Sequence, residues 1–149
     1  MTTETQGLET EWLLLQNQFD AYEKYSLVIK LVSVIVLCAF YWLNSVTAFA
    51  VMILLILWLQ DAIWKTFQSR ITPRLLMLEQ AMRVEHTQEK AAEDNPTVLP
   101  CQFNSQYALS RPSQRGLIKE YGLQALRPTV AFPHGVLVVL AIMMFIVTA

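Results

Sequence analysis

The sequence predicts an all-α integral membrane protein with three transmembrane helices, arranged as a helical hairpin followed by a C-terminal span, and with cytoplasmic amphipathic helices. Two observations predict this class. Hydrophobic residues make up 54% of the chain and charged residues only 15%, and the hydrophobic residues are concentrated in long uninterrupted runs. Basic residues, in contrast, are concentrated in one connecting segment. Three of the apolar runs approach the length of about 20 residues that a helix needs to cross a bilayer.

The first two spans are expected at residues 26–43 and 46–64. One helix over both would be about twice too long for a single crossing, so the chain is expected to fold back at Asn44–Ser45. The first span continues an N-terminal amphipathic helix without a break. In this helix large apolar residues recur at alternating steps of four and three and share one face: Leu8, Trp12, Leu15, Phe19 and Tyr22.

After Lys65 the chain becomes polar, and Thr72–Pro73 is expected to restart a helix, because threonine can cap and proline suits the first helical position. This helix is expected to extend to about Ala92 and carries a second apolar stripe of Leu75, Leu78 and Met82. Residues 95–112 contain three prolines and no periodicity, which predicts a loop. The expected divisions of the chain are therefore 1–92, 93–112 and 113–149.

Residues 113–127 are expected to form an amphipathic helix ahead of the third span, which is expected at 129–149. Basic residues spaced by four form a stripe on this helix, and one further arginine lies at its end. Cations beside an apolar face, next to a span, suit anionic lipid headgroups, although they can equally serve only to set the topology. The residues predicted to contact lipid are Arg111, Arg115, Lys119 and Arg127.

The orientation follows from the basic residues, because cytoplasmic connections are enriched in lysine and arginine. Residues 65–128 carry nine of the 11 Lys and Arg residues. We therefore expect this segment and the N-terminus in the cytoplasm and the C-terminus outside. The asymmetry and the compact size indicate a bacterial inner membrane. The formal net charge of −1 argues against an electrostatic nucleic-acid binder.

Lys30 and Asp61 are the charges within the first two spans. Lys30 lies 14 residues before Asn44 and Asp61 lies 16 residues after Ser45, so a hairpin places them at similar depth. A charge inside a span usually pairs with another or faces a cavity. We favour a structural role over an ion or proton site. The competing interpretation is that Lys30 snorkels to the headgroups while Asp61 bonds Lys65.

His134 follows Pro133 near the entry of the third span and is expected to be an interfacial residue, with a ligand role as the alternative. No nucleophile elbow, zinc-protease, P-loop or C-x-x-C motif occurs. We therefore predict no catalytic residue, no cofactor and no metal site, and a protein that is not an enzyme.

The favoured function is a scaffold or accessory subunit of the inner membrane, in contact with membrane lipids. It would assemble through its two cytoplasmic stripes with itself or with a larger membrane complex. The alternative is a homo-oligomeric channel or transporter component with Lys30 and Asp61 near the pathway.

Overall fold

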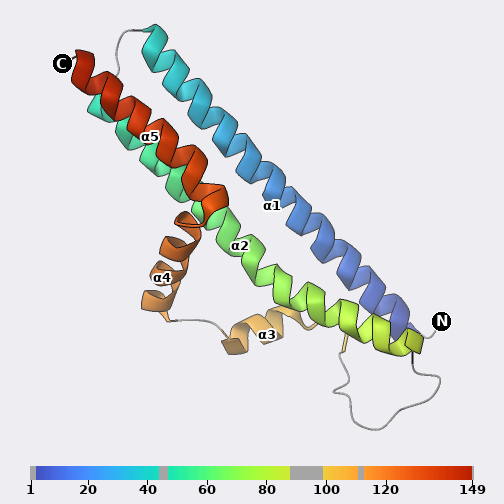
Figure 1. Cartoon of the computed structure of the whole chain (residues 1–149). Helices are drawn as coiled ribbons and strands as arrows, with labels where there is room; N and C mark the ends of the chain where they lie inside the picture. Colours follow the sequence, from blue (N-terminus) through green and yellow to red (C-terminus); the bar gives the residue numbers. More distant parts are fainter. Residues whose placement is uncertain (1–2, 44–46, 88–98, 111–112, 149) are drawn as a thin grey trace. The chain divides into compact units, whose positions relative to one another are not determined.

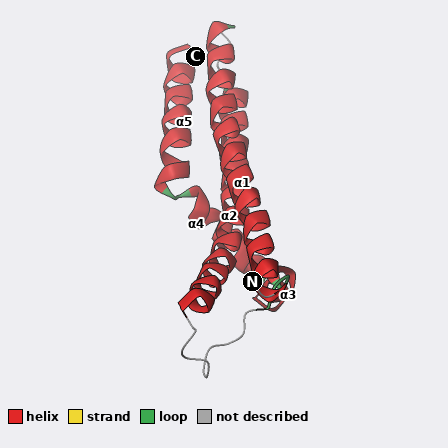
Figure 2. Cartoon of the chain, turned by 90° about the vertical axis from the view of Figure 1, so that its right-hand side faces the viewer, coloured by secondary structure: helices red, strands yellow, loops and turns green. Residues whose placement is uncertain are grey.

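The computed structural model describes residues 3–43, 47–87, 99–110 and 113–148, and every regular element in these ranges is an α-helix (Figures 1 and 2). The helices α1, α2 and α5 each contain a stretch long and apolar enough to cross a membrane. The chain is therefore a membrane protein with three candidate transmembrane helices. The elements in chain order are α1 (Thr3–Trp42), α2 (Ala48–Thr87), α3 (Phe103–Ser110), α4 (Gln114–Ala125) and α5 (Pro128–Thr148).

Helices α1 and α2 have 40 residues each, about twice the number that one crossing requires. Each of them contributes to two compact units. Unit 1 joins Met1–Ala21 with Gln68–Pro112, and unit 2 joins Tyr22–Phe67 with Ser113–Ala149. The divisions expected from the sequence follow chain order, whereas these units follow the contacts between helices.

Unit 2 contains the apolar segments of all three candidate spans. Its apolar core is formed by Leu37 of α1, Leu54 of α2 and Ala141 of α5. Small side chains at Ser33, Ala50 and other helix positions are fully buried, which lets helix backbones approach closely. Most large apolar side chains of the same segments point outward, as expected for surfaces that contact lipid; examples are Leu31, Ile35, Leu55, Ile56, Val139 and Ile142.

Helices α4 and α5 follow each other closely, and local chemistry sets their limits. The side chain of Ser113 accepts a hydrogen bond of 3.3 Å from the backbone N–H of Gly116, which caps the start of α4. Helix α5 begins at Pro128, where the missing N–H of proline costs nothing. The expected helix at 113–127 and the expected third span therefore both form, with limits shifted by one or two residues.

Unit 1 is built on the N-terminal half of α1 and the C-terminal half of α2. Leu8 and Leu15 of α1 are buried in it, as are Ile71, Leu75 and Leu78 of α2. Both sets recur at steps of three, four or seven, so each lies on one face of its helix. The two predicted apolar stripes thus supply buried side chains to the same unit.

The expected helix restart at Thr72–Pro73 is wrong. Helix α2 continues without interruption from Ala48 to Thr87 and contains Pro73 in its interior. A proline there removes one backbone hydrogen bond at a cost of about 3 kcal/mol. Pro73 is exposed, whereas Ile71, Leu75 and Leu78 on either side of it are buried, so packing across the proline holds the helix together.

The loop expected at 95–112 is also wrong in part. Phe103–Ser110 forms the short helix α3, in a stretch free of proline and glycine between Pro100 and Pro112. Two further expectations lie outside the described residues: the turn at Asn44–Ser45 and the helix end at Ala92.

Candidate functional site

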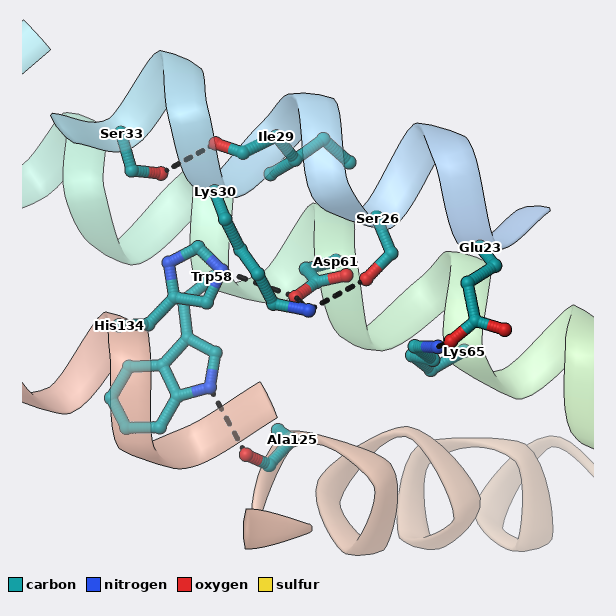
Figure 3. A network of polar contacts seen from close by, with 10 residues as sticks. All are labelled: Glu23, Ser26, Ile29, Lys30, Ser33, Trp58, Asp61, Lys65, Ala125 and His134. Carbon is teal, nitrogen blue, oxygen red and sulfur yellow. Dashed lines mark hydrogen bonds and ion pairs between the residues drawn. The ribbon is translucent and has the colours of Figure 1, made fainter. Parts of the chain in front are cut away.

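Three helices of unit 2 bring one polar side chain each to a common point (Figure 3). The Nζ atom of Lys30 on α1 lies 3.3 Å from Oδ2 of Asp61 on α2. The Nε2 atom of His134 on α5 lies 3.2 Å from the same oxygen. We call Lys30, Asp61 and His134 the charged triad. Because one carboxylate oxygen contacts both partners, Asp61 links all three candidate spans.

Local helix geometry prepares this arrangement on α1. Ser26 and Lys30 are four residues apart and therefore share a face of α1. The Nζ atom of Lys30 donates a hydrogen bond of 2.8 Å to Oγ of Ser26, which holds the ammonium group beside Asp61. The flexible lysine side chain is thus fixed at two points rather than left to extend toward the lipid headgroups.

Burial makes the contacts of the triad necessary. The side chains of Asp61 and His134 are 0% and 1% exposed, and that of Lys30 is 21% exposed. An ionised carboxylate withdrawn from water costs several kcal/mol unless a counter-charge and hydrogen bonds compensate it. Lys30 supplies the counter-charge, and His134 supplies a second donor to Oδ2.

Trp58 fixes the position of His134. The indole ring stacks on the imidazole ring, with centroids 6.4 Å apart and planes tilted by 11°. Its Nε1–H donates a hydrogen bond of 3.0 Å to the carbonyl oxygen of Ala125, the last residue of α4 (Figure 3). The last carbonyls of a helix lack partners within the helix, so Trp58 satisfies one of them. One side chain of α2 therefore holds both the end of α4 and the first turns of α5.

The hydrogen-bond roles of His134 follow from its neighbour. A carboxylate only accepts hydrogen bonds, so a neutral imidazole beside Asp61 carries its proton on Nε2. The basic lone pair is then on Nδ1. This atom is buried and has no hydrogen-bond partner among the described residues.

A second buried ion pair lies in unit 1. Arg74 of α2 donates to Glu11 of α1 through two parallel hydrogen bonds, Nε to Oε1 at 3.0 Å and Nη2 to Oε2 at 2.9 Å. This bidentate geometry is the strongest that arginine forms with a carboxylate. We call these two residues the Glu11–Arg74 clamp. Because both side chains are buried, neither can lose its partner without a large cost.

The Glu11–Arg74 clamp also holds the segment that leads into α3. Arg74 donates a hydrogen bond of 2.8 Å to the carbonyl oxygen of Leu99, and the backbone N–H of Cys101 donates one of 2.7 Å to Glu11. Cys101 has a φ of 63°, in the left-handed region that costs a non-glycine residue energy. At Gly7, an added Cβ would lie 3.2 Å from Pro100. The close approach of this segment to α1 therefore depends on the clamp and on glycine.

The predicted residues fall into three groups. Lys30 and Asp61 are brought together, whereas Lys65 contacts Glu23 at 3.4 Å and not Asp61. All eight predicted packing residues are buried or half-buried, and all but Tyr22 belong to unit 1. The half-buried ones are Trp12, Phe19, Tyr22 and Met82. The predicted lipid contacts Arg115, Lys119 and Arg127 are exposed, and Arg111 lies outside the described residues.

The sequence reasoning missed His134 as a partner of Asp61 and missed the Glu11–Arg74 clamp. The helical register carried a signal for each. Glu11 lies three residues after Leu8 and four before Leu15, on the buried face of α1. Arg74 lies three residues after Ile71 and four before Leu78. His134 lies four residues after Val130 and seven before Ala141.

No family model, no curated protein and no solved structure matches this chain.

We predict that Lys30→Met and Asp61→Asn interact in a double-mutant cycle. Each single change leaves the other group buried without its partner, so the two costs are expected to be less than additive by about 1–3 kcal/mol. The measurement is thermal or denaturant unfolding in detergent. Lys65→Met is the matched control: because Lys65 contacts Glu23, its effect is expected to add to that of Asp61→Asn. Additivity for Lys30 as well would contradict the pairing.

We predict that Glu11→Gln destabilises the protein by about 3–5 kcal/mol, because it leaves the Arg74 guanidinium buried without a counter-charge. The control is Glu9→Gln on the same helix, which removes a carboxylate outside the clamp and is expected to cost about 0.5 kcal/mol or less. The measurement is the unfolding free energy of each variant. Equal effects of the two variants would show that the clamp contributes no stability.

Proposed function

We propose that this chain is a non-enzymatic scaffold of the inner membrane that assembles with a second copy of itself through the cytoplasmic helices of unit 1. One observation carries this proposal. Unit 1, which does not contain the charged triad, exposes large apolar side chains on both of its long helices. The exposed fractions are 56% for Leu13, 67% for Leu14, 53% for Leu76 and 45% for Met77.

The exposed apolar side chains of unit 1 differ from those of unit 2 in the solvent that they are expected to face. In unit 2 an exposed leucine is satisfied by lipid, whereas unit 1 carries several of the basic residues that predict a cytoplasmic location. Large exposed apolar side chains on a water-facing surface mark sites of association. The Glu11–Arg74 clamp makes unit 1 a defined surface, because it fixes α1, α2 and the 99–101 segment to one another.

Charge supports a second copy as the partner. On α1, Glu9 and Asp20 lie four residues before and seven residues after Leu13, on the same helix face. On α2, Glu79 and Arg83 lie three and seven residues after Leu76, on the same face. Arg83 of one copy can therefore pair with an acidic residue on α1 of the other. In a two-fold dimer, α1 of each copy can pack on α2 of the other, which is the reciprocal pattern of an isologous interface.

The orientation belongs to the same proposal. If unit 1 is cytoplasmic, a reporter fused after residue 90 is expected to be cytoplasmic, and one fused after Ala149 is expected to be external, because nine of the 11 basic residues lie in 65–128. Paired alkaline phosphatase and green fluorescent protein fusions measure this. A cytoplasmic reporter at both positions would contradict the three-span topology.

We predict that Leu13→Glu and Leu76→Glu each convert the dimer to a monomer without unfolding it, because both side chains are exposed in one copy and buried in the proposed interface. A buried unpaired charge costs several kcal/mol. The combination of Leu13→Glu with Leu76→Lys is expected to restore association in part, because it places opposite charges across the interface. Mass measurement by light scattering in detergent follows each variant.

Leu109→Glu is the matched control for these variants. Leu109 is 90% exposed on α3, outside both faces, so this change is expected to leave the dimer intact. A monomeric native chain, or a dimer unaffected by the changes at Leu13 and Leu76, would overturn the proposal. Monomers that co-purify with one other protein would point instead to an accessory subunit.

A further inference from the structure

Within the charged triad, Lys30 and Asp61 can pair whether His134 is neutral or protonated. Lys30 and His134 contact the same oxygen of Asp61, at 3.3 and 3.2 Å. With a charged lysine, a charged carboxylate and a neutral imidazole, the triad is electrically neutral. Histidine is the side chain whose charge changes most readily near neutral pH. The triad therefore has two charge states that differ by one proton.

The position for that proton is Nδ1 of His134. Nε2 carries the hydrogen that faces Asp61, which leaves the lone pair of Nδ1 buried and without a partner among the described residues. A buried acceptor without a donor costs free energy. A proton bound there converts the ring to imidazolium and makes the contact with Asp61 an ion pair.

The surroundings suit a proton better than a metal ion. The ammonium group of Lys30 lies on the same carboxylate oxygen and repels a divalent cation. Among the described residues no group of three histidine, cysteine or carboxylate side chains could hold a metal. A proton, unlike a metal ion, needs no coordination shell.

We propose that Asp61, His134 and Lys30 form a proton-binding site within the candidate spans, with Nδ1 of His134 as the atom that takes up the proton from water. Each element packed at the site contributes one charged or titratable group: α1 gives Lys30, α2 gives Asp61 and α5 gives His134. Helix α4 contributes the uncharged carbonyl of Ala125 through Trp58. Proton uptake changes the triad from neutral to a charge of +1.

Proton uptake also affects the contact between α1 and α2. Once His134 is charged, Asp61 is neutralised by α5 as well as by α1, so Lys30 is held less strongly. Its side chain is the least buried of the three and keeps Ser26 as an alternative partner. The site thus links the protonation of α5 to the strength of the α1–α2 pair. This inference does not depend on the proposed dimer.

Nitrogen NMR of the full-length chain in detergent tests this site, because the chain contains only two histidines, His86 and His134. His86→Gln assigns the two signals. At alkaline pH, His134 is expected as the Nε2–H tautomer. As the pH falls, Nδ1 is expected to gain a proton. In Asp61→Asn the preference for the Nε2–H tautomer is expected to weaken, because an amide can donate a hydrogen bond to the ring as well as accept one from it.

His86 serves as the internal control in the same spectra and is expected to titrate alike in the native chain and in Asp61→Asn. His134→Gln keeps an N–H donor for Asp61 and cannot take up a proton, so the folded variant is expected to keep only the pH-dependent signals of His86. The Nδ1–H tautomer in the native chain, or a His134 that never gains a second proton, would overturn the proposal even if Asp61→Asn failed to fold. Uptake in the monomeric Leu13→Glu variant separates this site from the dimer.

Discussion

The structure depends on the cost of keeping a charge away from water. Each unit contains a buried carboxylate whose counter-charge comes from the other long helix: Asp61 with Lys30 in unit 2, and Glu11 with Arg74 in unit 1. An apolar contact between helices tolerates a small slide, because one leucine can replace another. A buried ion pair does not, since a shift of one residue separates the charges. Each pair therefore sets the register of α1 against α2 in its own unit.

The two pairs hold additional elements in different ways. The Glu11–Arg74 clamp binds backbone groups of the 99–101 segment. These contacts depend on the path of the main chain and not on the side chains of Leu99 and Cys101. The charged triad binds the side chain of His134, so α5 is held through one residue type. Trp58 strengthens this second attachment, because it contacts both the imidazole ring and the end of α4.

The sequence was sufficient for the three candidate spans and for the approach of Lys30 to Asp61, because hydropathy and hairpin counting depend only on spacing. It was not sufficient where tertiary packing overrides a local rule. Pro73 reads as a helix start, yet buried residues on both sides carry α2 through it. His134 was predicted to be an interfacial residue, because it lies 73 residues after Asp61 in the sequence and spacing alone does not show that Asp61 has a second partner. Burial of Glu11 and Arg74 was not predicted, because the two stripes were defined by apolar residues alone and left out charged residues in the same helical register.

The position of His134 late in the chain has a consequence for biosynthesis. Both residues of the Lys30–Asp61 pair are synthesised with the first two long helices, whereas His134 lies 73 residues after Asp61. At about 5–20 residues per second, that delay lasts roughly 4 to 15 seconds. During this interval Lys30 is the partner that compensates Asp61 in the nascent hairpin. Lys30 can therefore compensate Asp61 before the third candidate span has been made, and His134 completes the site only when the last helix arrives.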